Sequence, residues 1–186
     1  MIPKSIRHLT NAQKECLIQA YKVLKMNYED GDWFRDSAKR AITRAFYMQC
    51  KSFKTGFISN DAWLLKQNKK NVCFDHCFIP QLYCYYIMAN WKTIGKSLET
   101  FFPHWLIASM GIDVTSEENK MLSKFTVNNA STGNLLKVKV ALIDRYKKAS
   151  IQILDAETAD EVNFDVVDKR LDEGFSEWEK MNMLIK

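Results

Sequence analysis

Hydrophobic positions in the first two thirds of the chain recur at intervals of three and four residues, which is typical of helices with one buried face. The spacing predicts one helix from Asn11 to about Met26, with Thr10 as its N-cap, and a second from Phe34 or Asp36 to Ser52. A nearly continuous apolar and aromatic run from Pro80 to Trp91 predicts a largely buried helix, because proline suits the first helical turn. These three segments make the first part of the chain mainly helical.

Shorter signals lie between and after these helices. Thr55-Gly56 predicts a break between elements. The segment from Asn60 to Leu65 is expected to be helical, and the polar run from Gln67 to Asn71 predicts a loop. Gly95 marks a break before a further helix toward Phe102. These predicted breaks and loops divide the helical part of the chain into short elements.

The segment from Ile112 to Val114 predicts a short strand, and Thr115 with Glu118 three residues later forms a capping-box pattern that begins a helix through Lys124. The stretch from Val127 to Gly133 is polar and predicts a loop. The helical spacing ends at about this point.

Beyond residue 130 short alternating runs replace the helical spacing. They predict three strands, at Leu135 to Leu142, Ser150 to Leu154 and Glu161 to Val167. A turn at Ala156 to Ala159 separates the last two strands, and a helix at Ser176 to Ile185 closes the chain. The pattern therefore predicts an α+β fold, with mainly helical first two thirds, then a small antiparallel sheet and a C-terminal helix. Residues 1–130 and 131–186 form either two regions or one continuous domain, since no linker separates them.

Composition narrows the class of protein. A hydrophobic content of 47% with five Trp, seven Tyr and eleven Phe excludes a disordered chain. No apolar run reaches the ~20 residues that span a bilayer, so we expect no membrane insertion and a cytoplasmic location. The five cysteines fit neither a disulfide framework nor a zinc site, because no second pair of ligands follows Cys84, and free, largely buried thiols are expected.

Charge is distributed unevenly along the chain. Residues 1–100 hold 16 Lys and Arg against 8 Asp and Glu, a balance of +8, whereas residues 101–186 hold 11 against 14. A basic half fits a nucleic-acid partner, because phosphates supply most of the sequence-independent affinity in such complexes. The candidate DNA-binding residues are Lys39, Arg40, Arg44, Lys51, Lys69 and Lys70. A solvated helix face explains the first three of them equally well.

The pair Asp75-His76 holds one of only three histidines and directly follows a short apolar run. A histidine beside a carboxylate is the arrangement in which a nuclease places its general base next to a metal ligand. A buried, hydrogen-bonded structural histidine is the alternative.

Downstream, Asn119 follows the capping box and precedes Leu122, and Asn128 lies nine residues further on. Together with Asp75-His76 and Pro80, this order of residues resembles the HNH, or His-Me finger, endonucleases, and most of all their phage-encoded homing-type members. The resemblance implies a ββα-type site in which His76 is the general base, Asn119 has a positioning role, and Asp75 and Asn128 hold Mg²⁺ or Mn²⁺.

The resemblance further implies metal-dependent nicking or cleavage of double-stranded DNA, without an organic cofactor, in the cytoplasm of a bacterial host. A homodimer is one possible assembly. His76 and Asn119 are 43 residues apart, which exceeds the usual spacing of the family and implies an insertion or the loss of the metal cradle.

Three functions therefore stay open. The chain is a DNA endonuclease, a non-catalytic DNA-binding repressor derived from a homing-endonuclease scaffold, or a structural protein with an aromatic core.

Overall fold

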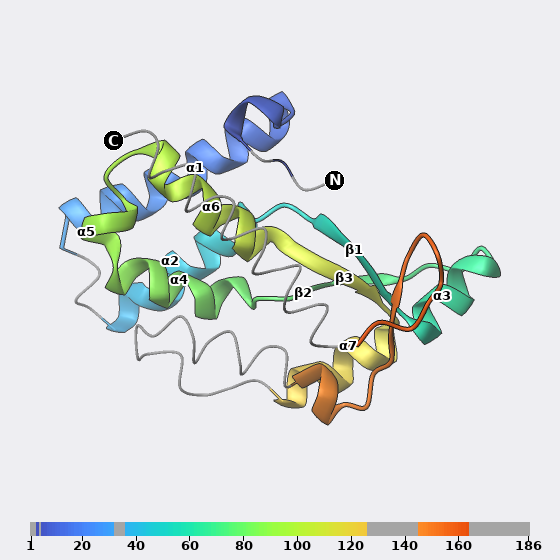
Figure 1. The fold of residues 1–186 in the computed structure, drawn as a ribbon. Helices are drawn as coiled ribbons and strands as arrows, with labels where there is room; N and C mark the ends of the chain where they lie inside the picture. The colour runs from blue at the N-terminus through green and yellow to red at the C-terminus, as the bar shows by residue number, and fades with distance from the viewer. Residues whose placement is uncertain (1–2, 4, 32–35, 126–144, 164–186) are drawn as a thin grey trace.

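The computed structural model of the chain describes residues 3, 5–31, 36–125 and 145–163 (Figure 1). The helices are α1 Asn11–Glu29, α2 Asp36–Met48, α3 Asn60–Gln67, α4 Pro80–Ala89, α5 Trp91–Ile94, α6 Leu98–Ser109 and α7 Ser116–Leu122, with 3-10 turns η1 Ile6–His8 and η3 Ser123–Phe125. The strands are β1 Phe53–Ser59, β2 Cys73–His76, β3 Met110–Val114 and β4 Ile153–Asp155. The chain is thus α+β.

The helix starts follow local capping chemistry. Thr10 and Gln13 form a reciprocal capping box at α1, and Thr115 and Glu118 do the same at α7, which confirms both predicted starts. Pro80 occupies the first turn of α4, as expected. None of the helices in the described residues has the length and apolar character needed to cross a bilayer.

The four strands form one mixed sheet in the order β2-β3-β1-β4. Strand β1 pairs with β3 in parallel, whereas the pairs β1-β4 and β2-β3 are antiparallel. Strand β3 confirms the short strand predicted at Ile112 to Val114. Strands β1 and β2 were not predicted, so placing the sheet after residue 130 was wrong for them. The parallel pair also departs from the expected antiparallel sheet.

Strand β1 was missed because Thr55-Gly56 was interpreted as an interruption. Gly56 has a φ of 86°, and the pairing register shifts between Lys54 and Ile58. A strand with such an irregularity loses the regular alternation of apolar and polar residues, so its sequence does not show the period of two.

The predictions for the last third are tested only in part. Strand β4 overlaps the predicted strand Ser150 to Leu154, and the turn over residues 156–158 confirms the turn between strands. Glu161 forms a single antiparallel bridge with Leu154. The predicted strand Leu135 to Leu142, the closing helix Ser176 to Ile185 and the boundary near residue 130 lie outside the described residues.

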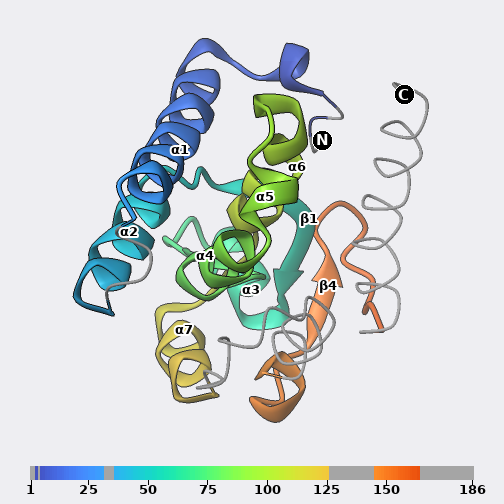
Figure 2. The ribbon, with the colours of Figure 1, turned by 90° about the vertical axis from the view of Figure 1, so that its left-hand side faces the viewer.

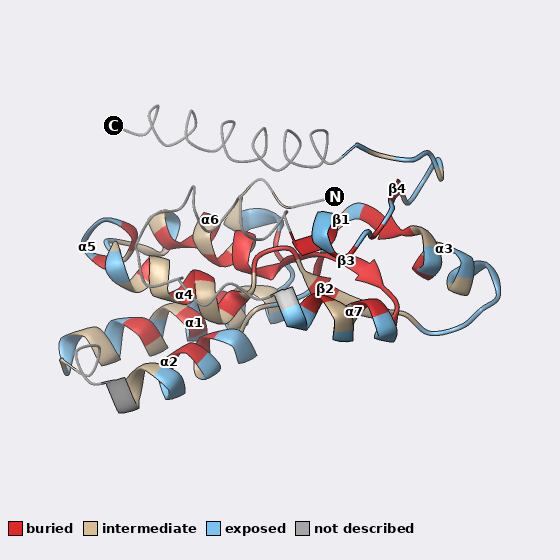
Figure 3. Cartoon of the chain, turned by 90° about the horizontal axis from the view of Figure 1, so that it is seen from below, coloured by how far each residue is buried: buried red, intermediate tan, exposed pale blue. Residues whose placement is uncertain are grey.

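Helices α1, α2, α4, α5 and α6 gather at one end of the sheet, whereas α3 lies at the other end (Figures 1 and 3). Side chains such as Tyr83, Phe101 and Trp105 are buried between the gathered helices, so the aromatic run of α4 belongs to the core. Strand β4 lies beside β1 at the edge of the sheet (Figure 2).

Each strand places alternate side chains on opposite faces of the sheet. The core face carries Ile112, Val114 and Phe57, which join the main hydrophobic cluster. We call the opposite face the basic face. It consists of strand residues that are partners or neighbours in the pairing register, together with one lysine of α3 that reaches them. Its members are Phe74, His76, Gly111, Asp113 and Lys54, together with Lys66. Beyond Lys54, a small cluster of Ile58, Leu154 and Ala62 packs α3 onto this face.

Candidate functional site: two acidic clusters on opposite faces of the sheet

Strand β2 separates the two residues of the Asp75-His76 pair. Asp75 pairs with Ile112, and its side chain lies on the core face of the sheet. His76 pairs with Gly111, and its side chain lies on the basic face. Neighbouring residues in a regular strand point to opposite sides, so adjacency in the sequence does not bring these two side chains together.

The Asp75 carboxylate is buried in an ion pair. Its Oδ2 atom accepts a hydrogen bond from Nη2 of Arg145 at 2.5 Å and another from the Tyr146 hydroxyl. The Arg145 and Asp75 side chains are only 3% and 9% exposed. Burial raises the pKa of Asp75, an effect that Arg145 and Tyr146 oppose. The carboxylate proposed as a metal ligand is therefore occupied by a cation that the protein itself supplies.

Arg145 also donates to the backbone carbonyl of His76, so it ties residues 145–148, which are helical, to β2. Nothing in the sequence signals this contact, because Arg145 and Asp75 are 70 residues apart. A lone arginine between predicted strands is indistinguishable from a surface residue until the fold is known.

His76 packs edge-on against two aromatic rings. The ring centroids of Tyr47 and Phe74 lie 5.8 and 5.1 Å from the imidazole centroid. The Nε2 atom is buried and has no hydrogen-bond partner among the described residues. Burial, aided by the charge of Arg145, lowers the pKa of His76 to about 4, so the imidazole is neutral at neutral pH.

Of the two asparagines in the predicted constellation, Asn119 lies in the described residues. Asn119 is half-buried on α7, a helix that contacts β2. No hydrogen bond joins Asn119 to Asp75 or His76 in the described part of the chain. Asn128 lies outside the described residues. Within the described ranges no group of three His, Cys, Asp or Glu side chains is arranged to hold a metal ion.

The second buried acid, Asp113, lies on the basic face and is held by two lysines. Lys54 donates to Oδ2 of Asp113 at 2.8 Å, and Lys66 donates to the same oxygen. The Asp113 side chain is 6% exposed, whereas those of Lys54 and Lys66 are 62% and 38% exposed. Burial alone would raise the pKa of Asp113, but the two lysines outweigh it and lower the pKa. Two ammonium groups on one carboxylate leave a net positive charge that solvent can reach.

The six cations expected to bind DNA fall into two groups. Arg40 and Arg44 are exposed on α2, and Lys39 beside them is half-buried. The exposed Lys51 precedes β1, and the exposed pair Lys69 and Lys70 follows α3. The second group flanks Lys54 and Lys66 in the sequence, and these two lysines were not among the six predicted residues. The lysine cluster, as we call it, consists of Lys51, Lys54, Lys66, Lys69 and Lys70.

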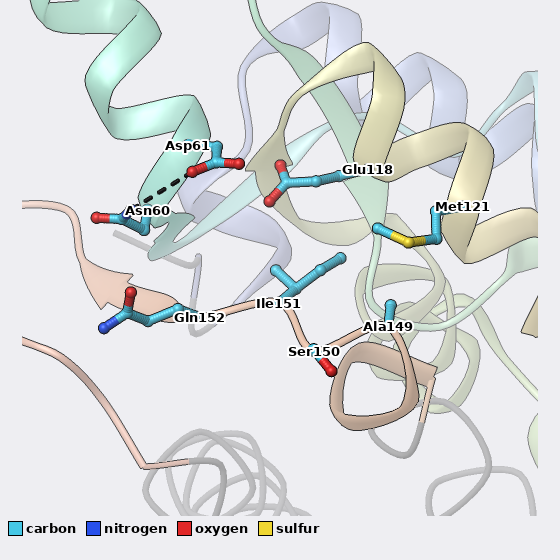
Figure 4. Close-up of a pocket in the computed structure, with 8 residues that line it drawn as sticks. All are labelled: Asn60, Asp61, Glu118, Met121, Ala149, Ser150, Ile151 and Gln152. Carbon is cyan, nitrogen blue, oxygen red and sulfur yellow. Dashed lines mark hydrogen bonds between the residues drawn. The ribbon is translucent and has the colours of Figure 1, made fainter.

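A separate cavity of about 210 Å³ opens between the start of α3, helix α7 and residues 149–152 (Figure 4). The carboxylates of Asp61 and Glu118 face each other across it. Oε2 of Glu118 accepts hydrogen bonds from the Ser59 hydroxyl at 2.6 Å and the Thr115 N–H at 2.7 Å. These bonds hold the end of β1 against α7, so this oxygen already has a structural role.

The cysteines are unpaired, and burial affects the ionisation of Cys77 and Cys84. All five are free, which confirms the expectation of unpaired thiols. Burial raises the pKa of Cys77 to about 12, and it also raises that of Cys84. These two thiols are therefore protonated and poor nucleophiles at neutral pH.

Comparison of the chain with protein-family models, with curated proteins and with solved structures gave no match. The function is therefore inferred from the geometry and charge of the described residues.

Proposed function

We propose that this protein binds DNA through its exposed cations and is non-catalytic. The main support is the pair of lysines that share Asp113, because they place excess positive charge on an accessible sheet face. Lys51, Lys69 and Lys70 are exposed as well, and each lies within four residues of Lys54 or Lys66 in the sequence. Phosphate backbones bind such clusters with release of counterions, which requires no base recognition.

The α2 surface is a second contact region in this proposal. Arg40 and Arg44 are one helical turn apart and both are exposed, so they project from the same side of the helix. Arginines on one side of a helix suit phosphates of double-stranded DNA, because guanidinium groups bind phosphate oxygens in pairs.

A nuclease is the second candidate function. Its support is the neutral imidazole of His76, the protonation state that a general base needs, together with the position of Asn119 on a helix that contacts β2. The ion pair of Asp75 with Arg145 favours the non-catalytic alternative, because metal binding at Asp75 would have to replace a buried arginine contact.

The test combines binding and cleavage. Duplex DNA affinity is measured across a salt series for the wild type and for variants Arg40→Ala/Arg44→Ala and Lys69→Ala/Lys70→Ala. The matched control, Lys92→Ala/Lys96→Ala, removes two exposed charges near α5. We expect both test variants to bind more weakly and to flatten the salt slope by about 1 per lost phosphate contact. Equal losses in the control would mean that only net charge matters.

Supercoiled plasmid is incubated with the wild type and with His76→Ala, in Mg²⁺, in Mn²⁺ and in chelator. We expect no conversion to open-circle or linear DNA in any condition. Metal-dependent conversion that falls by ~10²-fold or more in His76→Ala would establish the nuclease instead.

A further inference from the structure

The basic face combines an aromatic ring with two ammonium groups. Phe74 pairs with Asp113 across β2 and β3, and its side chain is half-buried. A Cβ atom added to Gly111 would lie 2.4 Å from Cζ of Phe74, so the ring lies over this glycine. Gly111 is in turn the register partner of Lys54 in β1.

The distances between these groups are set by the sheet. Adjacent strands lie about 4.8 Å apart, so the Phe74 ring over β3 is about one strand spacing from the start of the Lys54 side chain. Lys66 reaches the same carboxylate from α3. The His76 ring packs against the Phe74 ring, and the ring of Tyr47, which is 37% exposed, packs against His76 in turn. These three rings lie side by side along edge strand β2.

We infer that the basic face binds a single-stranded nucleic acid, with an unpaired base against Phe74 and its phosphates on Lys54 and Lys66. This inference rests on the proposed DNA-binding function and specifies the form of nucleic acid that this face accepts. A base offers its flat surface only when it is unpaired, because neighbouring pairs cover that surface in a duplex. Stacking on an aromatic side chain contributes ~1–3 kcal/mol per base.

Charge decides between this partner and a protein partner. The ammonium groups beside the ring repel cationic partners and leave one positive charge after Asp113 is neutralised. A nucleic acid supplies both a ring and a phosphate in every residue, which suits a surface where Phe74 pairs in register with the aspartate that two lysines share. An acidic peptide supplies the charge without the regular supply of rings, so it should compete poorly.

Binding is measured by fluorescence anisotropy with a labelled single strand of mixed sequence and with its duplex. The variants are Phe74→Leu, which keeps an apolar group over Gly111, and Lys54→Gln/Lys66→Gln/Asp113→Asn, which removes all three charges without leaving a buried carboxylate. Tyr85→Leu, a half-buried aromatic on α4, is the matched control.

The wild type should bind the single strand more tightly than the duplex. Phe74→Leu should weaken single-strand binding by ~5- to 150-fold and leave duplex binding unchanged. The charge variant should weaken single-strand binding and flatten its salt dependence, and Tyr85→Leu should match the wild type. Competition by polyglutamate as strong as that by unlabelled single strand would overturn the inference.

The outcomes separate the inference from the proposed function. Duplex binding that is tighter than single-strand binding, or that falls equally in Phe74→Leu, overturns the inference and keeps the function. Absence of binding to either form overturns both. If Phe74→Leu does not fold, photocrosslinking of the wild type to a strand with halogenated pyrimidines decides: a crosslink at Phe74, His76 or Tyr47 supports the inference, and crosslinks only elsewhere overturn it.

Discussion

Asp75 and Asp113 lie on neighbouring strands of one sheet, and each is a buried acid held by basic side chains. Asp75 faces the core and is paired with a single, equally buried arginine. Asp113 faces the other side and is shared by two lysines that remain partly exposed. The two acids therefore differ in how far their basic partners reach solvent.

The difference lies in the charge that is left over. The Asp75-Arg145 pair is neutral and closed, so it can anchor residues 145–148 but offers nothing to a ligand. The Asp113 cluster keeps one uncompensated charge at the surface, and the exposed Lys69 and Lys70 follow Lys66 within four residues. This difference is the basis on which we propose a binding role for the basic face and a structural role for the core face, where Asp75 is located.

The largest effect should come from breaking the core-face pair. Arg145→Met leaves the Asp75 carboxylate buried without its cation, which should cost ~3–5 kcal/mol of unfolding free energy. Urea unfolding measures this loss. The control is Lys148→Met, an exposed lysine in the same short helix, which should change stability by less than ~0.5 kcal/mol. Equal effects of the two substitutions would contradict the anchoring role.

The pH dependence of stability tests the buried state of His76. Its pKa is about 4 in the folded protein and near 6.5 when unfolded, so the unfolded chain binds the extra proton between these values. Stability should therefore fall as the pH drops from 6.5 to 4, by as much as ~3 kcal/mol from this residue. His76→Phe should remove this part of the acid sensitivity.

Unfolding measured by denaturant at several pH values checks that expectation. His8→Phe, at an exposed position, is the control and should keep the wild-type profile. A wild-type profile in His76→Phe as well would show that this imidazole is not held neutral by the fold.

Gly111→Ala tests whether the Phe74 ring lies where the structure places it. The added Cβ would also meet the Asp75 carbonyl oxygen at 2.3 Å, and backbone atoms cannot yield easily. We expect a loss of ~1–3 kcal/mol, comparable to overpacking of a core. The double variant Gly111→Ala/Phe74→Leu should recover only part of the loss, since the backbone clash remains; full recovery would show that the ring alone limits the space.

Single lysine substitutions should have the smallest effect on stability. Lys54→Gln or Lys66→Gln leaves the other lysine on Asp113, so each should cost less than ~1 kcal/mol. The double substitution should cost more than the sum of the two, because Asp113 then loses both partners. A double-mutant cycle by thermal unfolding measures this difference, and strict additivity would mean that the two lysines do not share the carboxylate in solution.

The sequence predicted elements that carry their own local signals. The capping boxes at Thr10 and Thr115 and the proline at the start of α4 are satisfied within a few residues, so the predicted helices formed there. Strand β1 was not predicted, because its irregular register and Gly56 obscure the alternation that marks a strand.

The site was less predictable than the fold. Adjacency suggested that Asp75 and His76 act together, but a regular strand turns them to opposite faces. The partners Arg145 and Lys66 come from segments 70 and 47 residues away from the acids they bind. Such contacts depend on tertiary packing, which a single sequence does not encode in any local pattern.

Lysine footprinting locates the bound nucleic acid on the protein surface. The protein is acetylated briefly, free and bound to a single-stranded oligonucleotide, and the modified lysines are quantified by mass spectrometry. Binding at the basic face should protect Lys54, Lys66 and Lys69, while the exposed Lys22 and Lys92 on other helices keep their reactivity. Protection confined to lysines outside the lysine cluster, or equal protection of all lysines, would contradict the account.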